Sequence, residues 1–578
     1  MRRLSRVLLS IGGWSLVLAA AEAAAGPADS LYKLVPPDAG ATLAVENLRT
    51  RTREVGSSPL IASLRRLPMV QGWLRSERFR QLERLSAEIE TALGVPFSVI
   101  RDELIGDAVV LVYQPGPGNA PELARGLLLA SPRDRPLMVR LVDSLNANQR
   151  RSGELTRLDK KGRRGLEYIA RNFKPGTRLA EFYAHLDDGT FAWSNSEALI
   201  HGVIDRKVGG GPSLKENSAF LGVRSALPDK ALASLFVNPR LVERTMAASI
   251  RPIEPGQERV LAALGRYLAA VGYAGLALEW RDGPVLHLHE SLDPTKLDPW
   301  LKAWLSHPPA PAGWLGQVPE TALAVLAAHV DFEAVRGALW DLVPDDDRPG
   351  LDNYRQIFQG LLLGLDPNTE ILPRLRPGVL AYIEARPEIG VRPLFPIVGA
   401  VGWSDQPGEG ELSPPIDNAL RTALAAFAID PARKARHLRI ESRKVGEARS
   451  TELTDGATAL FAYRVDPDGV VLGNAAEAVA RFGSAKLPSA IREVRKAYFP
   501  EAETYAVVDL IRLVRVVRTY RGAIAGQLAT QANRPLDDLD RDLGQWLALA
   551  DLFRAVAFTS ASKPDASAIH RTFSLIVR

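Results

Sequence analysis

Short apolar runs alternate along the chain with longer stretches in which apolar residues recur every three or four positions. Residues 34–48 predict a turn and a strand, and residues 79–95 have the spacing of an amphipathic helix. Residues 104–114 and 126–132 then predict two strands, and residues 136–147 predict a second helix. The pattern indicates a chain in which strands and helices are mixed.

The same order of elements recurs in the second part of the chain. A turn and strand, a helix, two strands and a helix are predicted again; they fall at residues 317–331, 353–367, 375–385, 395–405 and 416–428. Each of the two longer helices is followed by a Leu-Gly pair, at Leu93-Gly94 and Leu363-Gly364, and Gly favours a helix end. The sequence therefore predicts two related halves.

One repeated stretch of sequence gives the strongest support for two related halves. FYAHLDDGTFAWSNSEALI (residues 182–200) resembles FAYRVDPDGVVLGNAAEAV (residues 461–479), and the Asp of each Asp-Gly is offset by 468 − 188 = 280 residues. Asp-Gly predicts a tight hairpin because Gly adopts positive φ without a Cβ clash. We expect Asn195 and Asn474, just after each hairpin, to cap the helices that follow.

The predicted fold class is α+β, with two pseudo-repeated halves, mainly antiparallel sheets and helices packed on one face. Short, hairpin-like connections favour this arrangement over the alternative, a doubly wound parallel sheet. The predicted organisation is a signal peptide at 1–25 and halves at 26–310 and 311–578. Each half divides into a larger and a smaller unit, which span 35–206 and 213–307 in the first half and 318–482 and 488–578 in the second.

The first 25 residues have the three parts of a secretory signal peptide. MRRLSR is basic, VLLSIGGWSLVLAA is apolar, and AEAAAG offers the small residues that a peptidase requires. An uncleaved membrane anchor is the alternative. Cleavage after Ala25 removes three Arg and one Glu, so the net charge falls from +5 to 5 − 3 + 1 = +3. No later apolar run reaches the length of a membrane helix, so we expect export to the periplasm or cell envelope and no integral membrane span after cleavage.

The amino-acid composition excludes several kinds of chemistry. The chain has no Cys, which excludes disulfides, Cys zinc sites and thiol catalysis, and which in an exported chain favours a bacterial envelope protein. A charge of +5 over 578 residues is close to neutral, so the basic isoelectric point does not predict nucleic acid binding.

The phrases VPPDAGATLAV, LIGDAVVLV, LDDGTFAWSNSEAL and LKENSAFLGVRSALPDKALASLFVN resemble a group of bacterial exported proteins of unknown function. The resemblance covers most of the chain after the signal peptide and implies a signal peptide with duplicated strand–helix units. It supplies no catalytic residues. The second half departs from the group where Leu375-Arg376-Pro377-Gly378 replaces Leu104-Ile105-Gly106-Asp107.

His287 and His289 are the candidate metal ligands, since residues two apart in a strand face the same side. Zinc needs three or four protein ligands, and the neighbouring sequence offers no other His, so the favoured interpretation is a solvent-facing strand edge and no metal site. The sequence contains neither G-x-S-x-G nor H-E-x-x-H, and it predicts no catalytic residue and no cofactor.

Basic residues form the candidate ligand or anionic-surface sites. Lys160 and Lys161 in one half and Lys444 in the other lie in matched basic turns. Arg residues recur every three positions in IRLVRVVRTYRG, where we expect one cationic helix face that could contact anionic lipid or polysaccharide; they are Arg512, Arg515, Arg518 and Arg521. A solvated helix face is the plainer alternative.

These observations favour an exported cell-envelope protein with a non-enzymatic binding or structural role. The partner would be an envelope protein, a polysaccharide or a lipid, and not a nucleic acid. One alternative is a carrier of an apolar ligand such as lipid in a groove between sheet and helices, and another is a hydrolase whose site has no recognised motif.

Overall fold

The structure is a computed structural model of the 578-residue chain. The predicted signal peptide lies outside the residues that it describes. These are 26–116, 123–176, 178–240, 257–306, 317–344, 347–385, 394–404, 410–429, 437–445, 448–456, 459–483, 489–498 and 504–578.

The chain divides into two compact units. Unit 1 comprises Met1–Arg251 and Tyr267–Lys296, and unit 2 comprises Pro252–Arg266 and Leu297–Arg578. Helix α12 (Gln257–Ala270) crosses this division, because its residues up to Arg266 belong to unit 2. Pro252–Arg266 and Leu297–Ala310, which the predicted domain boundaries place in the first half, therefore belong to unit 2.

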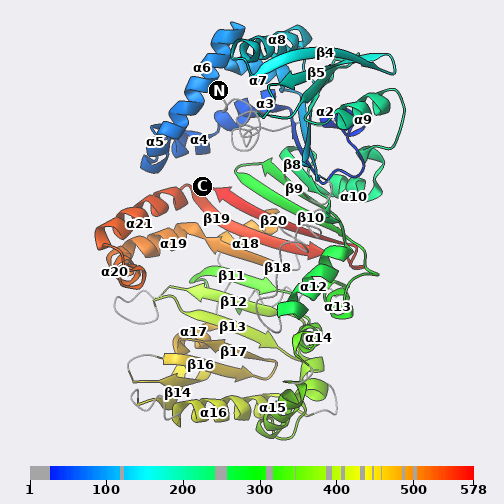
Figure 1. Ribbon diagram of the computed structural model, residues 1–578. Coiled ribbons are helices and arrows are strands. Elements are labelled where there is room, and N and C mark those ends of the chain that lie inside the picture. The colour runs from blue at the N-terminus through cyan, green and yellow to red at the C-terminus, as the bar shows by residue number, and fades with distance from the viewer. Residues whose placement is uncertain are drawn as a thin grey trace. The chain divides into compact units, whose positions relative to one another are not determined.

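Unit 1 contains an antiparallel sheet with the strand order β10-β9-β8-β1-β2-β3-β7-β6-β5-β4. Figure 1 labels β4, β5, β8, β9 and β10 of these strands. Its described strands are β1 (Ala41–Glu46), β2 (Ala108–Gln114), β3 (Arg125–Ala130), β4 (Leu155–Arg163), β5 (Leu166–Phe173), β6 (Glu181–His185), β7 (Phe191–Ser194), β8 (Ala231–Val237), β9 (Val271–Trp280) and β10 (Pro284–Leu292).

Unit 2 contains an antiparallel sheet with the order β20-β19-β18-β11-β12-β13-β17-β16-β15-β14. Its described strands are β11 (Ala322–Ala328), β12 (Val379–Glu384), β13 (Ile397–Gly402), β14 (Arg439–Val445), β15 (Ala448–Thr454), β16 (Ala459–Asp466), β17 (Gly469–Gly473), β18 (Thr504–Asp509), β19 (Phe553–Ser562) and β20 (Ala568–Val577).

The strand order is the same in both units, with each strand of unit 2 numbered ten higher than its counterpart in unit 1. The α+β class and the antiparallel pairing are thereby confirmed. Equal strand order is a necessary feature of the predicted duplication; the duplication itself stays a prediction, which superposition of the two units would test.

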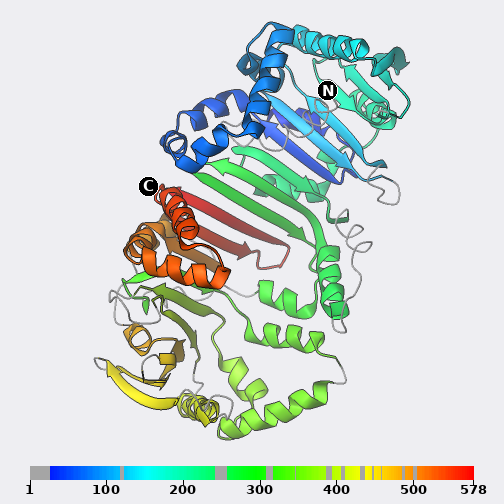
Figure 2. The same ribbon diagram turned by 60° about the vertical axis from the view of Figure 1, so that its left-hand side comes forward.

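Helices connect and cover these strands. In unit 1 they are α2 (Pro27–Tyr32), α3 (Leu48–Gly56), α4 (Pro59–Leu64), α5 (Pro68–Leu74), α6 (Glu77–Leu93), α7 (Phe97–Leu104), α8 (Arg135–Arg151), α9 (Glu197–Lys207), η3 (Leu214–Glu216) and α10 (Ser218–Ala226). In unit 2 they are α13 (Pro299–Ser306), α14 (Phe332–Leu342), α15 (Arg348–Leu361), η6 (Pro367–Ile371), η7 (Leu372–Arg374), α16 (Ser413–Ile429), α17 (Ala476–Arg481), α18 (Ser489–Tyr498), α19 (Leu510–Thr519), α20 (Arg521–Ala532) and α21 (Leu536–Ala550). Figure 2 shows the orange and red helices α20 and α21, which contact one another.

Helices pack on both faces of the sheet in unit 1, and not on one face as the sequence predicts. Val110 and Leu129 pack with α2, α9 and α10 in one core, whereas their strand neighbours Val109 and Ala130 pack with α7 and α8 in another. The physical reason is visible in β2 and β3, whose nearly continuous apolar runs present large side chains to both faces.

Unit 2 has the same two-sided core. Val398 and Val471 pack with α17 and α18, while Val470 and Leu472 lie on the opposite face in clusters with residues of α16. Within the described residues, no helix combines the length and the apolar character that crossing a membrane requires.

The repeated hairpin forms in both units, but its Asp-Gly has two different roles. Gly189 has a φ of +89°, as predicted, but residues 186–190 connect β6 to β7, so the predicted two-residue turn is wrong there. Gly469 instead begins β17 and pairs with Asp466 across a two-residue turn. A Cβ at Gly469 would lie 2.9 Å from the carbonyl oxygen of Val401, so close packing, and not a positive φ, requires Gly there.

The two Asn residues after the hairpins do not cap the following helices, which begin after Ser196 and Ala475. Asn195 accepts a hydrogen bond from the amide of Gly126 at 2.8 Å, and Asn474 accepts one from the amide of Ile397 at 2.8 Å. Both partners lie at the start of the neighbouring strand, β3 or β13. The capping prediction is wrong, because each Asn side chain instead forms a hydrogen bond to the backbone of the neighbouring strand.

Candidate functional site

The candidate basic residues of unit 1 lie on β4 and are paired with carboxylates. Lys160 contacts Glu167 at 2.7 Å on an exposed surface. Lys161 donates to Glu197 at 2.7 Å, in the first turn of α9. Exposed pairs of this kind contribute about 0–1 kcal/mol, and an anionic ligand would compete with them.

The matching basic residues of unit 2 lie on β14. Arg443 pairs with Glu477 in the first turn of α17 at 2.7 Å, which repeats the Lys161–Glu197 contact of unit 1. Lys444, the residue that the sequence predicts as a candidate, is exposed on the same strand. Lys160, Lys161 and Lys444 thus lie on strands and not in turns, so that part of the sequence prediction is wrong. Lys161 and Arg443 each hold a strand against the start of a helix, and a role of the basic residues in ligand binding stays a prediction.

A hydrogen-bonded group surrounds the Lys161–Glu197 pair. The Tyr168 hydroxyl donates to Glu197 at 2.7 Å, and His201 Nε2 lies 2.8 Å from the same hydroxyl. Burial and the hydrogen bond to Glu197 raise the pKa of Tyr168 to about 12, so its hydroxyl keeps its proton at neutral pH. Hydrogen bonds from Lys161 and Tyr168 hold the pKa of Glu197 below its usual value. This group is suited to holding structure and not to proton abstraction.

The row of four Arg residues does not form one helix face. Helix α19 ends at Thr519, and Arg521 begins α20. Three of the four are already engaged: Arg512 with the carbonyl of Glu320, Arg518 with Asp551 at 3.1 Å, and Arg521 with Asp540 at 2.6 Å. Arg515 is exposed, and no ion pair joins it to another described residue. The single cationic face is therefore wrong in its geometry, while anion binding by these residues stays a prediction.

His287 and His289 are buried on β10, so the expectation of a solvent-facing strand edge is wrong. Their face of the sheet also bears Ala277 and Gly275, their register partners on β9, and it packs against α10. His287 Nε2 lies 3.0 Å from Glu279. Burial raises the pKa of Glu279, but the hydrogen bonds from His287 and Arg281 outweigh it and hold that pKa below its usual value. Across the described ranges no three His or acidic side chains gather as a metal would need.

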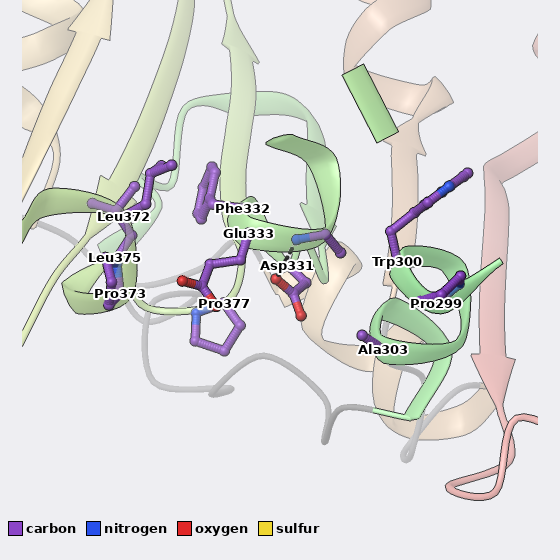
Figure 3. Close-up of a pocket in the computed structure, with 11 residues that line it drawn as sticks. Pro299, Trp300, Ala303, Asp331, Phe332, Glu333, Leu372, Pro373, Leu375 and Pro377 are labelled. Atoms are coloured by element: carbon purple, nitrogen blue, oxygen red, sulfur yellow. Dashed lines mark hydrogen bonds between the residues drawn. The ribbon is translucent and has the colours of Figure 1, made fainter. Parts of the chain in front are cut away.

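A cavity of about 450 Å³ lies in unit 2, and sequence analysis did not predict it. Three segments build it: the start of α13, the start of α14 and the residues around η7 (Figure 3). Apolar residues and carboxylates both line it; the apolar ones are Pro299, Trp300, Ala303, Phe332, Ala334, Leu372, Pro373, Leu375 and Pro377. Its volume falls in the range of ordinary small-molecule sites.

Two carboxylates are the charged groups of the cavity. Asp331 caps α14 and accepts a hydrogen bond from the amide of Ala334 at 2.9 Å. Glu333 is exposed and forms no ion pair with any described residue. Figure 3 shows both side chains at the start of α14, with Pro377 beside Glu333. Among the part of the chain that the structure describes, no Lys, Arg or His lines the cavity, so its described lining combines apolar side chains with negative charge.

The segment before β12, which lines one side of the cavity, is not one regular helix. Pro367 and Pro373 each stand in the first turn of a short helix, η6 or η7, and Pro377 follows shortly before β12. Proline lacks the amide hydrogen that a continuing helix needs. The departure of residues 375–378 from the first half was visible in the sequence, and it supplies Leu375 and Pro377 to the cavity wall.

Helix α15, which precedes η6 in the chain, has an exposed apolar stripe. Large apolar residues recur three or four positions apart and are largely exposed: Leu351 37%, Tyr354 62%, Ile357 59% and Phe358 53%. Helix α15 has no buried residue along its 14 positions. An amphipathic helix normally buries such a stripe.

Each sheet also has an apolar row on the face opposite its buried layer of helices α10 or α18. In unit 1 the row runs across Leu235, Leu276 and Leu288, which are register neighbours and only half-buried. In unit 2 it runs across Leu326, Ala506, Phe558 and Phe573, with Leu326 and Phe573 exposed. These rows are surfaces on which an apolar ligand or partner could lie.

No protein-family model, curated protein or solved structure matches this chain.

Proposed function

We propose that this protein is an exported, non-enzymatic binding protein of the cell envelope and that it binds its partner through an apolar surface. The observation that carries the proposal is the stripe on α15, formed by Leu351, Tyr354, Ile357 and Phe358. Fully burying one such side chain stabilises a complex by about 1.5–3 kcal/mol. An exposed apolar patch of this kind is typical of an interaction site.

Export is the first part of the proposal, and the three-part leader of residues 1–25 supports it. N-terminal sequencing of the chain recovered from a bacterial periplasmic fraction should begin at Gly26. Recovery of the chain with Met1 in the cytoplasmic fraction would reject export but would leave the binding surface untouched.

Binding through α15 is tested by a photo-crosslinking amino acid placed at Ile357 of the exported chain. The matched control places it at Gln356, an exposed neighbour outside the stripe. Adducts of defined mass should form from position 357 and not from position 356. Equal labelling at both positions, or none at either, would remove the stripe as a binding surface.

Carriage of an apolar ligand is the second candidate function, and the apolar rows on the two sheets favour it. The row Leu326, Ala506, Phe558 and Phe573 lies across four neighbouring strands, which is long enough for an alkyl chain. Native mass spectrometry of the chain purified from envelope fractions should detect a bound lipid. Repeated recovery of the empty chain would reject carriage.

A further inference from the structure

We propose that the cavity of unit 2 binds an apolar ligand that carries a positively charged head group, such as an alkylammonium amphiphile. The cavity lies in one unit, between α13, α14 and η7, and it is separate from the α15 stripe. The inference rests on the carriage function for its ligand class, and it assigns a site and a charge preference to that function.

The walls of the cavity determine the apolar part of the ligand. Trp300 and Phe332 supply aromatic surface, and Leu372 and Leu375 supply aliphatic surface. Three prolines complete the lining, at positions 299, 373 and 377. Aromatic and aliphatic walls of this composition bind ligands by removing apolar area from water, at about 25 cal/mol per Å².

The charge of the lining determines the head group. Asp331 and Glu333 contribute two carboxylates, and none of the described residues that line the cavity is basic. An anionic head would be repelled by both, whereas a cation is attracted to them. Glu333 is the group that remains available, because Asp331 already caps α14.

Rigid segments hold these groups in place before a ligand arrives. The Asp331 cap fixes the start of α14, on which Phe332 and Glu333 are consecutive residues. Asp366 caps η6 by accepting from the amide of Asn368 at 2.8 Å, and Leu375 forms a β-bridge with the fully buried Trp403. A preformed site loses little conformational entropy on binding.

The test uses three probes of equal chain length, each below its critical micelle concentration. They are octyltrimethylammonium, octyl glucoside and octyl sulfate, and their affinities for the full chain are measured by isothermal titration calorimetry. The cationic probe should bind tightest. Its advantage over the neutral probe should fall at high salt, since a half-exposed charge interaction is screened.

Two variants locate the binding. Glu333→Gln should weaken the cationic probe about fivefold and leave the neutral probe unchanged, because removal of a partly exposed charge partner costs about 1 kcal/mol. Glu88→Gln, an exposed carboxylate on α6 of unit 1, makes the same change of charge and should alter neither affinity. Ala303→Trp should block all three probes by filling the cavity, and circular dichroism checks that this variant is folded.

Each outcome bears on a different statement. Equal affinity for the three probes, abolished by Ala303→Trp, would leave carriage standing and overturn the charge preference. Binding that survives Ala303→Trp in a folded variant, or no binding of any probe, would overturn the site. Neither result touches the α15 surface, which the crosslinking experiment tests alone.

Discussion

The two units have one strand order but fill the space before their second core strand differently. In unit 1 this space holds α7, whose Ile100 and Leu104 are buried in a core with α8. In unit 2 it holds η6 and η7, and a cavity lies beside them. The comparison teaches that one strand order is compatible with a packed core at this place in one unit and an open site in the other. In unit 2 the segment at this place contains prolines in the first turns of η6 and η7.

The largest expected effect is on unit 1. Arg171 is buried on β5, where its guanidinium pairs with Glu181, donates to Asn146 at 2.8 Å and lies 4.5 Å from the ring centroid of Trp193. Arg171→Met removes one side of a buried pair, so it should lower the free energy of unfolding of unit 1 by about 3–5 kcal/mol. Differential scanning calorimetry should show a lowered transition for that unit.

Arg443→Met in unit 2 is the matched control, because its ion pair with Glu477 is half-exposed. It should cost about 0–1 kcal/mol. Equal losses for the two variants would mean that burial does not distinguish these Arg residues.

A smaller effect is expected for glycines in the segments before β2 and β12, where the two units differ in structure. A Cβ at Gly106, just after α7, would collide with the carbonyl oxygen of Asp102, so Gly106→Ala should destabilise unit 1 by about 1–3 kcal/mol. Gly360 in α15 has open space around it, and Gly360→Ala should stabilise its helix by about 0.5–1 kcal/mol. Urea denaturation measures both, and the same sign for both changes would contradict the packing described.

The Lys161–Glu197 contact predicts a dependence on pH. Because the folded-state pKa of Glu197 is lowered, its contribution to stability is present above the unfolded-state pKa, about 4.3, and is lost as the pH falls through the folded-state value. The stability of Glu197→Gln relative to the wild type should therefore be lowest near neutrality and should recover as the pH falls below about 4. Thermal melts between neutrality and acid pH measure this, and a constant difference would reject it.

The smallest effect is expected at Arg515, which is exposed on α19. Arg515→Ala should change the free energy of unfolding by less than about 0.5 kcal/mol. If the Arg residues bind anionic surfaces, it should also reduce sedimentation with anionic vesicles at low salt. Arg521→Ala is the comparison variant, because Arg521 forms an ion pair with Asp540 and its removal changes a structural contact as well as the charge. If vesicle binding is the same for the wild type and Arg515→Ala and does not change with salt concentration, the anionic-surface hypothesis is rejected.

Local signals in the sequence predicted much of the architecture. The helix end at Leu93-Gly94 is confirmed, since Gly94 adopts a φ of +67° as the cap of α6. Strands and helices fall close to their predicted ranges because apolar periodicity reports the buried face. The second unit's helix α15 ends at Leu361, just before the predicted Leu363-Gly364 pair.

Features that depend on distant contacts could not be read in this way. The burial of His287 and His289 depends on α10, which lies some 60 residues earlier in the chain. The break at Tyr520 divided the row of Arg residues because their spacing alone does not show where one helix stops. The cavity needed three segments to meet, and only one of them, around Pro377, differed visibly between the halves.

Asn195 and Asn474 have a consequence for the rate at which each sheet assembles. Each side chain reaches back across 69 or 77 residues of sequence to the beginning of a strand made much earlier in synthesis. That strand, β3 or β13, lacks its neighbour β7 or β17 until the hairpin has been synthesised and has packed against it. Closing such long loops slows folding. We therefore expect the Asn contact of each unit to form only after its hairpin has been made and has paired with that strand.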